Sequence, residues 1–209
     1  MIYPNREAAG RALGGVLEHL RATDPLILGL PRGGVPVAVA IRAVIGGEVD
    51  VLLVRKLGVP WQPELAMGAI GEDGVRVLNA DVVRSTGVSP EQFAEVERLE
   101  RTELERRRGV LRVAAPIALK DRTVVIADDG MATGATAAAA CEIARLHEPR
   151  RVVVAIPVSS PEALQRIRSL ADEVVCPLVP HHLGGVGGVY RDFHQLDDDE
   201  VVALLTESR

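Results

Sequence analysis

The chain has 209 residues, of which 47% are hydrophobic and 25% charged, a composition typical of a soluble globular protein with one substantial core. Its formal net charge of -5 argues against general affinity for nucleic acids or membranes. Its two distant cysteines exclude a disulfide scaffold, and the lack of a long apolar run or a signal-like start leads us to expect a cytoplasmic protein.

Apolar strands and amphipathic helices alternate along the chain. Hydrophobic residues at helical spacing predict a first helix over residues 6–21, and a run rich in Val predicts a strand over residues 49–55. The other predicted strands cover residues 25–30, 123–127, 151–157 and 173–176, and the other short helices cover residues 35–45, 135–147, 161–170 and 197–205. This alternation predicts an α/β fold with a mainly parallel sheet flanked by helices.

Two regions interrupt the alternation. Residues 58–84 combine prolines with a Gly-Glu-Asp-Gly turn, which predicts an inserted, flexible hairpin. Residues 180–195 are rich in Gly and His and predict an irregular segment before the final helix. Between these regions, a capping box at Ser89 predicts a long charged helix to about Arg112. Its Glu–Arg pairs, spaced four residues apart, indicate a solvated face.

The segment from Val124 to Thr136 carries the clearest chemistry. It reads Val-Val-Ile-Ala-Asp-Asp-Gly-Met-Ala-Thr-Gly-Ala-Thr, so two acids follow directly on a buried strand, where open α/β sheets bind ligands. Adjacent carboxylates can hold sugar hydroxyls or a divalent metal, whereas a simple capped turn would need only one acid. The Gly- and Thr-containing loop opens onto a helix, whose first N–H groups suit a phosphate. The segment therefore predicts a ribose-phosphate site.

All thirteen positions of this segment resemble the fingerprint of the type I phosphoribosyltransferases, which bind phosphoribosyl pyrophosphate (PRPP). The resemblance implies that the two acids hold the ribose hydroxyls and that the loop cradles the 5′-phosphate. The PRPP-binding residues implied in this segment are Asp128, Asp129, Gly130, Met131, Ala132, Thr133, Gly134, Ala135 and Thr136.

Two further segments fit the same family. The family places its pyrophosphate loop after an earlier strand, often with a strained peptide bond, and here that place belongs to Arg32, Gly33 and Gly34. Glycine permits close backbone approach and Arg32 can fork onto pyrophosphate oxygens, although an ordinary turn with a solvated arginine is the alternative. Arg55 and Lys56 end the next predicted strand on the ligand side, and a lysine in an arginine-rich chain suggests a point-charge phosphate contact.

Beyond the fingerprint, the motifs Pro-Arg-Gly-Gly-Val-Pro-Val-Ala at residues 31–38 and Arg-Lys-Leu-Gly at residues 55–58 are similar to those of an uncharacterised group of bacterial phosphoribosyltransferases. The resemblance implies a Rossmann-like fold, a role in nucleotide metabolism and a homodimer. It also implies a single phosphoribosyltransferase domain over residues 1–209, with the flexible insertion at about 58–84 and a C-terminal hood at about 178–209.

The implied reaction is displacement of pyrophosphate from C1 of PRPP by a nucleophile, usually a ring nitrogen of a base. The resemblance assigns the catalytic work to Asp128, Asp129, Lys56 and Arg32. It also implies a Mg²⁺ ion that bridges the ribose hydroxyls and the pyrophosphate, with Asp128 and Asp129 as candidate ligands. The partners expected are therefore PRPP and a small-molecule acceptor, with neither nucleic acid nor membrane.

The acceptor pocket is expected in the hood and the insertion. Trp61, Tyr190 and Phe193 are candidates because aromatic rings stack on bases, although packing of the last two against the final helix is the favoured alternative. Ala132 stands where the hypoxanthine–guanine enzymes of the family carry an Asp, so adenine, orotate, uracil or non-nucleobase acceptors stay open. A PRPP- or nucleotide-binding regulator on the same fold, with little catalysis, is the alternative function.

Overall fold

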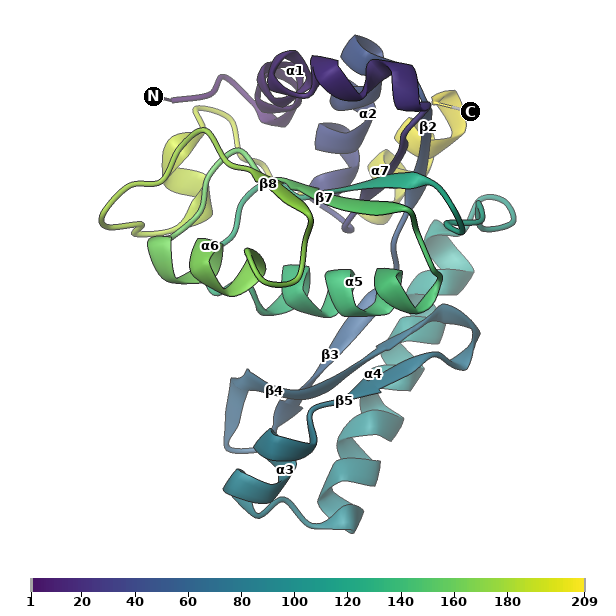
Figure 1. Cartoon of the computed structure of the whole chain (residues 1–209), viewed down its shortest axis with the longest axis vertical. Helices are drawn as coiled ribbons and strands as arrows, with labels where there is room; N and C mark the ends of the chain where they lie inside the picture. Colours follow the sequence, from purple (N-terminus) through teal and green to yellow (C-terminus); the bar gives the residue numbers. More distant parts are fainter. Residues whose placement is uncertain (1, 209) are drawn as a thin grey trace.

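A five-stranded parallel sheet forms the centre of the computed structural model, which describes residues 2–208 (Figure 1). The strand order is β2–β1–β6–β7–β8, with every neighbouring pair parallel. The strands are β1 (Leu26–Gly29), β2 (Glu48–Val51), β6 (Thr123–Ala127), β7 (Arg151–Ala155) and β8 (Glu173–Val175). The chain runs outward from β1 to β2 on one side and from β6 to β8 on the other. The connections therefore diverge between β1 and β6, where sheets of this kind bind ligands.

Helices cover both faces of this sheet. Alternate residues of each strand enter two separate cores, for example Val125 in one and Ile126 in the other, because strand side chains point to opposite faces. One face carries α1 (Arg6–Val16), α2 (Gly34–Ile45) and α7 (Asp198–Glu207), and the other carries α5 (Ala135–Leu146) and α6 (Pro161–Ile167) (Figure 1). The predicted α/β class with a mainly parallel sheet is thus confirmed.

A second, antiparallel sheet follows β2 and lies on the far side of α5 from the main sheet (Figure 1). It consists of β3 (Val54–Val59), β4 (Gln62–Gly71) and β5 (Arg76–Leu78) in that order, and α4 (Pro90–Leu111) packs against it after the short helix α3 (Ala80–Thr86). We refer to β3–β5 as the hairpin sheet. A three-residue 3-10 turn, η2 (Glu72–Gly74), joins its last two strands.

The predicted strand over residues 49–55 is wrong as a single element. It is divided between β2, which ends at Val51, and β3, which begins at Val54 and pairs with β4 instead of the main sheet. Leu52 and Leu53, which connect them, are both buried. An unbroken apolar run gives no sign of such a change of pairing partner, because every residue in it suits a buried strand equally well. The insertion therefore begins before residue 58.

The first predicted helix is also shorter than expected. It ends at Val16, and the separate 3-10 helix η1 (Glu18–Thr23) follows. Gly10 and Gly14 let α1 approach α2 closely, since a Cβ on either would lie 2.6 Å from an atom of α2. The helices α2, α4, α5, α6 and α7 begin within one residue of their predicted starts, whereas α3 overlaps the expected flexible insertion and was not predicted. Ser89 and Asp197 cap α4 and α7 with capping boxes, and Ser160 caps α6.

The irregular C-terminal segment contains one further 3-10 helix, η3 (Val186–Val189), and returns to the N-terminus of the chain. Its Val189 carbonyl accepts a hydrogen bond from the Tyr3 N–H, and the Arg191 N–H donates to the Tyr3 carbonyl. Within residues 2–208, none of the helices combines the length and the hydropathy that a membrane crossing requires.

Candidate active site

The predicted pyrophosphate loop and the acidic pair lie side by side at the carboxyl ends of β1 and β6. The Leu30 N–H donates to the Ala127 carbonyl at 2.9 Å, which ties the two loops together. A Cβ on Gly34 would lie 2.3 Å from that same carbonyl, so only glycine allows this approach. The peptide bond between Pro31 and Arg32 is cis.

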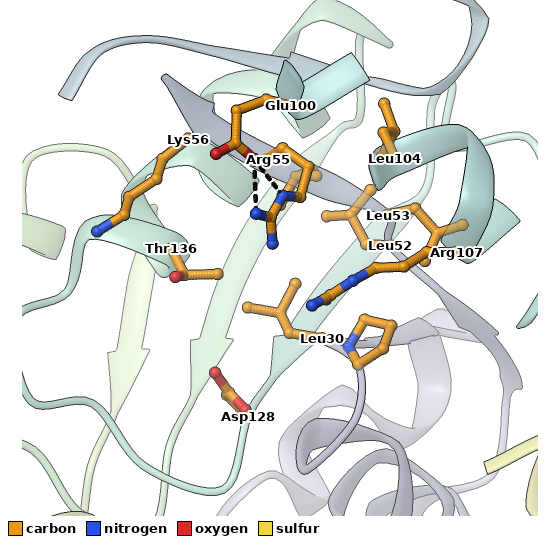
Figure 2. A pocket seen from close by; sticks show the side chains of 12 residues that line it. Leu30, Leu52, Leu53, Arg55, Lys56, Glu100, Leu104, Arg107, Asp128 and Thr136 are labelled. Atoms are coloured by element: carbon orange, nitrogen blue, oxygen red, sulfur yellow. Dashed lines mark hydrogen bonds and ion pairs between the residues drawn. The ribbon is translucent and has the colours of Figure 1, made fainter. Parts of the chain in front are cut away.

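A cavity of about 300 Å³ opens above these loops (Figure 2). The main sheet and α5 contribute Asp128 and Thr136, and the hairpin sheet contributes Arg55 and Lys56. The structure therefore brings together residues that separate sequence motifs predicted. The remaining lining residues come from the loop after β1, the β2–β3 connection, the start of β3 and α4, and are Leu30, Pro31, Leu52, Leu53, Val54, Glu100, Leu104 and Arg107.

Two charged residues of α4 line this cavity although the sequence indicated a solvated face. Glu100 accepts from Arg55, with 2.6 Å between the Arg55 Nη2 and Glu100 Oε2 atoms, and the Arg107 side chain points into the cavity (Figure 2). Both share one helical face with the buried Leu104 and Leu111, at spacings of four, three and four residues. That apolar stripe was the signal that could have found them. The predicted Glu97–Arg101 and Glu103–Arg107 pairs on α4 do form.

The two adjacent acids face different partners. Asp128 lines the cavity, and its Oδ1 accepts from the Asp129 N–H at 2.9 Å. Asp129 instead meets the guanidinium of Arg6, with 2.7 Å between Nε and Oδ2. Burial raises the pKa of the Asp128 carboxyl well above its usual value, and the charge of Asp129 raises it further. Burial also raises the pKa of Asp129, against the lowering effect of Arg6.

The loop between β6 and α5 is hydrogen-bonded on one side to the segment between β7 and α6, and its two threonines are exposed on the other. The Met131 N–H donates to the Val158 carbonyl at 2.9 Å, and the Ser160 hydroxyl donates to the Ala132 carbonyl at 2.7 Å. Thr133 and Thr136 are exposed, and Gly134, at a φ of 75°, begins α5 without a side chain that could cap it. The Ala135 N–H donates to the Thr133 hydroxyl oxygen at 3.4 Å, and the first turn of α5 presents the positive end of the helix to this loop, an arrangement that suits an anion.

The hairpin sheet reaches this loop through Glu64. The Glu64 Oε1 atom lies 2.5 Å from the Lys56 Nζ atom, and Thr133 of the loop lies near the same carboxylate. Lys56 and Thr133 together lower the pKa of the Glu64 carboxyl. A carboxylate thus stands between the predicted phosphate loop and the lysine predicted to contact phosphate.

Of the predicted acidic segment and phosphate loop, only Asp128 and Thr136 line the cavity. Four predicted site residues outside that segment carry side chains that do not line it. The Arg32 side chain is exposed, and its Nη1 lies 3.6 Å from the Asp198 Oδ1 of α7. Trp61 is 57% exposed at the β3–β4 turn. Tyr190 and Phe193 stack with their ring centroids 4.9 Å apart, and the Tyr190 hydroxyl donates to the Asp129 carbonyl.

The favoured interpretation of Tyr190 and Phe193, packing against the final helix, is wrong. They pack with Tyr3 and Ala9 of the N-terminal region, because the C-terminal segment runs back along it before α7 begins. Trp61 is not part of that cluster, and the hairpin sheet and the C-terminal segment lie at opposite ends of the view in Figure 1.

The chain is similar to proteins of one family. A family model described as the phosphoribosyl transferase domain matches residues 1–194. Two Mycobacterium tuberculosis proteins, from strains CDC 1551 and H37Rv and each named "Putative phosphoribosyl transferase", are 50% identical over 205 residues. The match covers 98% of this chain and 46% of each relative, so the chain spans about half the length of these curated relatives. The crystal structure of TT1426 from Thermus thermophilus is 43% identical, with a TM-score of 0.87 over 100% of this chain and 99% of that one.

Proposed function

The chain belongs to the phosphoribosyl transferase domain family, and we propose that it transfers the ribose 5-phosphate of PRPP to a nitrogen nucleophile with release of pyrophosphate. The observation that carries this proposal is the cavity in which Asp128 and Thr136 face Arg55, Lys56 and Arg107. It combines a carboxylate for hydroxyl groups, the start of a helix for a phosphate and cations for a second anionic group.

The charges of the cavity suit the two ends of PRPP. The 5′-phosphate fits the N-terminal end of α5, beside the exposed Thr133 and Thr136. The pyrophosphate, which gains negative charge as its bond to C1 breaks, fits the side that carries Arg55, Lys56 and Arg107. These three cations are paired here with Glu100, Glu64 and Glu103, so the pyrophosphate would compete with those carboxylates for them. The protein contributes by holding the ribose between these groups and by excluding water, which would otherwise compete as the nucleophile.

The residues present also fit a Mg²⁺ ion. In proteins this ion takes one or two carboxylates and completes its coordination with substrate phosphates and water, and Asp128 offers such a carboxylate within the cavity. Among residues 2–208, no group of three or more acidic, His or Cys side chains forms a complete protein cage. A bound Mg²⁺ would neutralise charge on the departing pyrophosphate.

Replacement of Asp128 by Asn tests the site. We expect Asp128→Asn to abolish PRPP binding, measured by calorimetry with Mg²⁺ present, because the amide cannot replace a carboxylate toward ribose hydroxyls or metal. The variant should be at least as stable as the wild type, because the substitution removes the repulsion between two adjacent, half-buried acids. Asp81→Asn, on the exposed surface of α3, changes the same charge away from the cavity and should bind like the wild type.

Two outcomes would contradict the proposal. Folded wild-type protein that gives no heat of binding with millimolar PRPP and Mg²⁺ would exclude PRPP as the ligand. Asp128→Asn that unfolds at markedly lower temperature would instead assign the acid a structural role.

The acceptor needs a separate experiment. Pyrophosphate release should be followed with PRPP and a panel of purine bases, pyrimidine bases and simple amines. Turnover with one of them would identify the acceptor class. Tight PRPP binding without turnover on any acceptor would favour a PRPP-binding regulator on the same fold.

A further inference from the structure

Arg6 is a buried cation in an unfavourable place. It is the first residue of α1 and only 8% exposed, so its charge lies both out of solvent and at the positive end of a helix. A guanidinium in this position needs a strong partner, and the Asp129 carboxylate provides it at 2.7 Å. Departures from local preference of this kind concentrate at functional sites.

The guanidinium is fixed by two further contacts. Its Nη1 donates to the His194 carbonyl at 2.9 Å, and its Cζ lies 3.9 Å above the centroid of the Phe193 ring. One planar group therefore connects α1, the C-terminal segment and the end of β6. Because the Nε and Nη1 donors have fixed relative directions, the orientation of the guanidinium is determined before any ligand binds.

Asp129 is held equally tightly. A Cβ on Gly33 would lie 1.9 Å from its Oδ2 atom, so the carboxylate rests directly on the predicted pyrophosphate loop. The Tyr190 hydroxyl, from the C-terminal segment, donates to the Asp129 backbone carbonyl. The side chain thus lies between Arg6 and Gly33, with its backbone tied to Tyr190.

We propose that Arg6 is a positioning residue of the PRPP site, which acts through Asp129. It holds this carboxylate against the pyrophosphate loop in the orientation that the ribose hydroxyls require. It also ties that orientation to the C-terminal segment, through the His194 carbonyl and the Phe193 ring. The inference rests on the proposed function, since it concerns the affinity of the same site for PRPP.

The test measures the dissociation constant for PRPP by calorimetry in the presence of Mg²⁺, at a temperature where circular dichroism shows every variant to be folded. Arg6→Met keeps the bulk of the side chain and removes its donors, and it should weaken PRPP binding at least tenfold. Arg6→Lys restores the charge without the planar fork, and it should recover part of that loss.

Two controls separate positioning from stability. Arg11→Met removes an exposed arginine of the same helix, which pairs only with Glu7 among the described residues, and should leave PRPP affinity unchanged. Leu13→Ala empties a fully buried position on α1, so it should lower the unfolding temperature while PRPP affinity stays within twofold of the wild type.

Arg6→Met that binds PRPP like the wild type would overturn the inference and leave the proposed function intact. A loss of affinity in Leu13→Ala as large as that in Arg6→Met would also overturn it, because destabilisation alone would then explain the effect. An absence of PRPP binding by the wild type would instead contradict the proposed function itself.

Discussion

Two neighbouring aspartates have different environments in this protein. Asp128 looks into a cavity with arginine and lysine on its far side, while Asp129 turns back to a buried arginine from the N-terminal helix. The peptide bond that joins them places their side chains in different directions, so they need not do the same work. We propose that Asp128 meets the ligand directly and that Asp129 is shared between the ligand and Arg6.

The prediction at this scale concerns Gly33, whose φ of -61° and ψ of -30° any residue can adopt. Its requirement for glycine is therefore steric, because a Cβ would displace the Asp129 carboxylate. We expect Gly33→Ala to weaken PRPP binding at least tenfold and to cost about 1–3 kcal/mol of stability, as overpacking typically does. Calorimetry and urea unfolding measure the two effects.

Gly109→Ala is the matched control for this prediction. Gly109 lies within α4, where a Cβ would meet no atom within 4 Å. Alanine should there stabilise the protein by about 0.4–1 kcal/mol and leave PRPP binding unchanged. If Gly33→Ala behaved in the same way, the close contact between the loop and Asp129 would matter neither for PRPP binding nor for stability.

Sequence reasoning at the residue scale found the groups that lie within one motif. Asp128, Thr136 and Lys56 were predicted from short segments, and the structure places all three on one cavity. Arg6 was missed because its partner is 123 residues away, and a helical surface position carries no sign of such a contact. Arg32 is the reverse case. Its local motif suggested a contact with pyrophosphate, but the structure places its side chain beside Asp198.

At the scale of elements, α4 and the hairpin sheet form one wall of the cavity and are firmly joined to the main sheet. Arg112, which follows α4, contacts Asp50 of β2 with 2.6 Å between Nη1 and Oδ1, and it also bonds to Glu72 at the β4–β5 turn. The Asp50 carboxylate accepts in addition from the Ile117 N–H at 3.0 Å. These largely buried ionic contacts join the hairpin sheet to the main sheet. They therefore hold the end of the hairpin sheet at the β4–β5 turn in place.

The hairpin prediction concerns Glu64, which pairs with Lys56 and lies near Thr133 in this structure. A phosphate that entered the loop would have to displace this carboxylate or accept its repulsion. We therefore expect Glu64→Gln to raise the affinity for PRPP roughly threefold to tenfold, or about 0.6–1.4 kcal/mol. Calorimetry at two salt concentrations should show the gain shrinking as salt screens the charge.

Glu95→Gln provides the control for Glu64→Gln. It changes the net charge by the same amount at an exposed position of α4, where Glu95 pairs with Arg98. Its effect on PRPP affinity should be negligible. Weaker binding by Glu64→Gln would show that Glu64 supports the ligand instead of competing with it.

The elements themselves were largely predictable because their ends carry clear chemistry. Ser89 caps α4 as its capping box predicts, and the run of Val and Ile before Asp128 forms a buried strand over Thr123–Ala127. The division of residues 49–55 between two sheets was not predicted. Strand pairing depends on partners distant in sequence, and one strand's hydrophobicity does not reveal them.

For the molecule as a whole, the site lies between two bodies with different architectures. The five-stranded sheet supplies Asp128 and the loop before α5, and the hairpin sheet with α4 supplies the cations. The net charge of -5 gives PRPP no general attraction, so the local cluster of Arg55, Lys56 and Arg107 must capture it. Sequence reasoning predicted the parallel sheet, but not that α4 would form a wall of the site.

Because both bodies contact the same cavity, a ligand that bridges them should stabilise the entire fold. We expect PRPP with Mg²⁺, at a hundredfold excess over its dissociation constant, to raise the free energy of unfolding by about 2.7 kcal/mol, measured in urea at 25 °C.

Mg²⁺ alone should have no such effect, because the described residues form no protein cage for it. Removal of the metal with EDTA should abolish most of the gain from PRPP, because the several negative charges of the ligand would then face the cavity without a counter-ion. Asp128→Asn should show no gain under any of these conditions. Equal stabilisation with and without EDTA would mean that the protein binds PRPP through its own cations, and the magnesium requirement would be withdrawn.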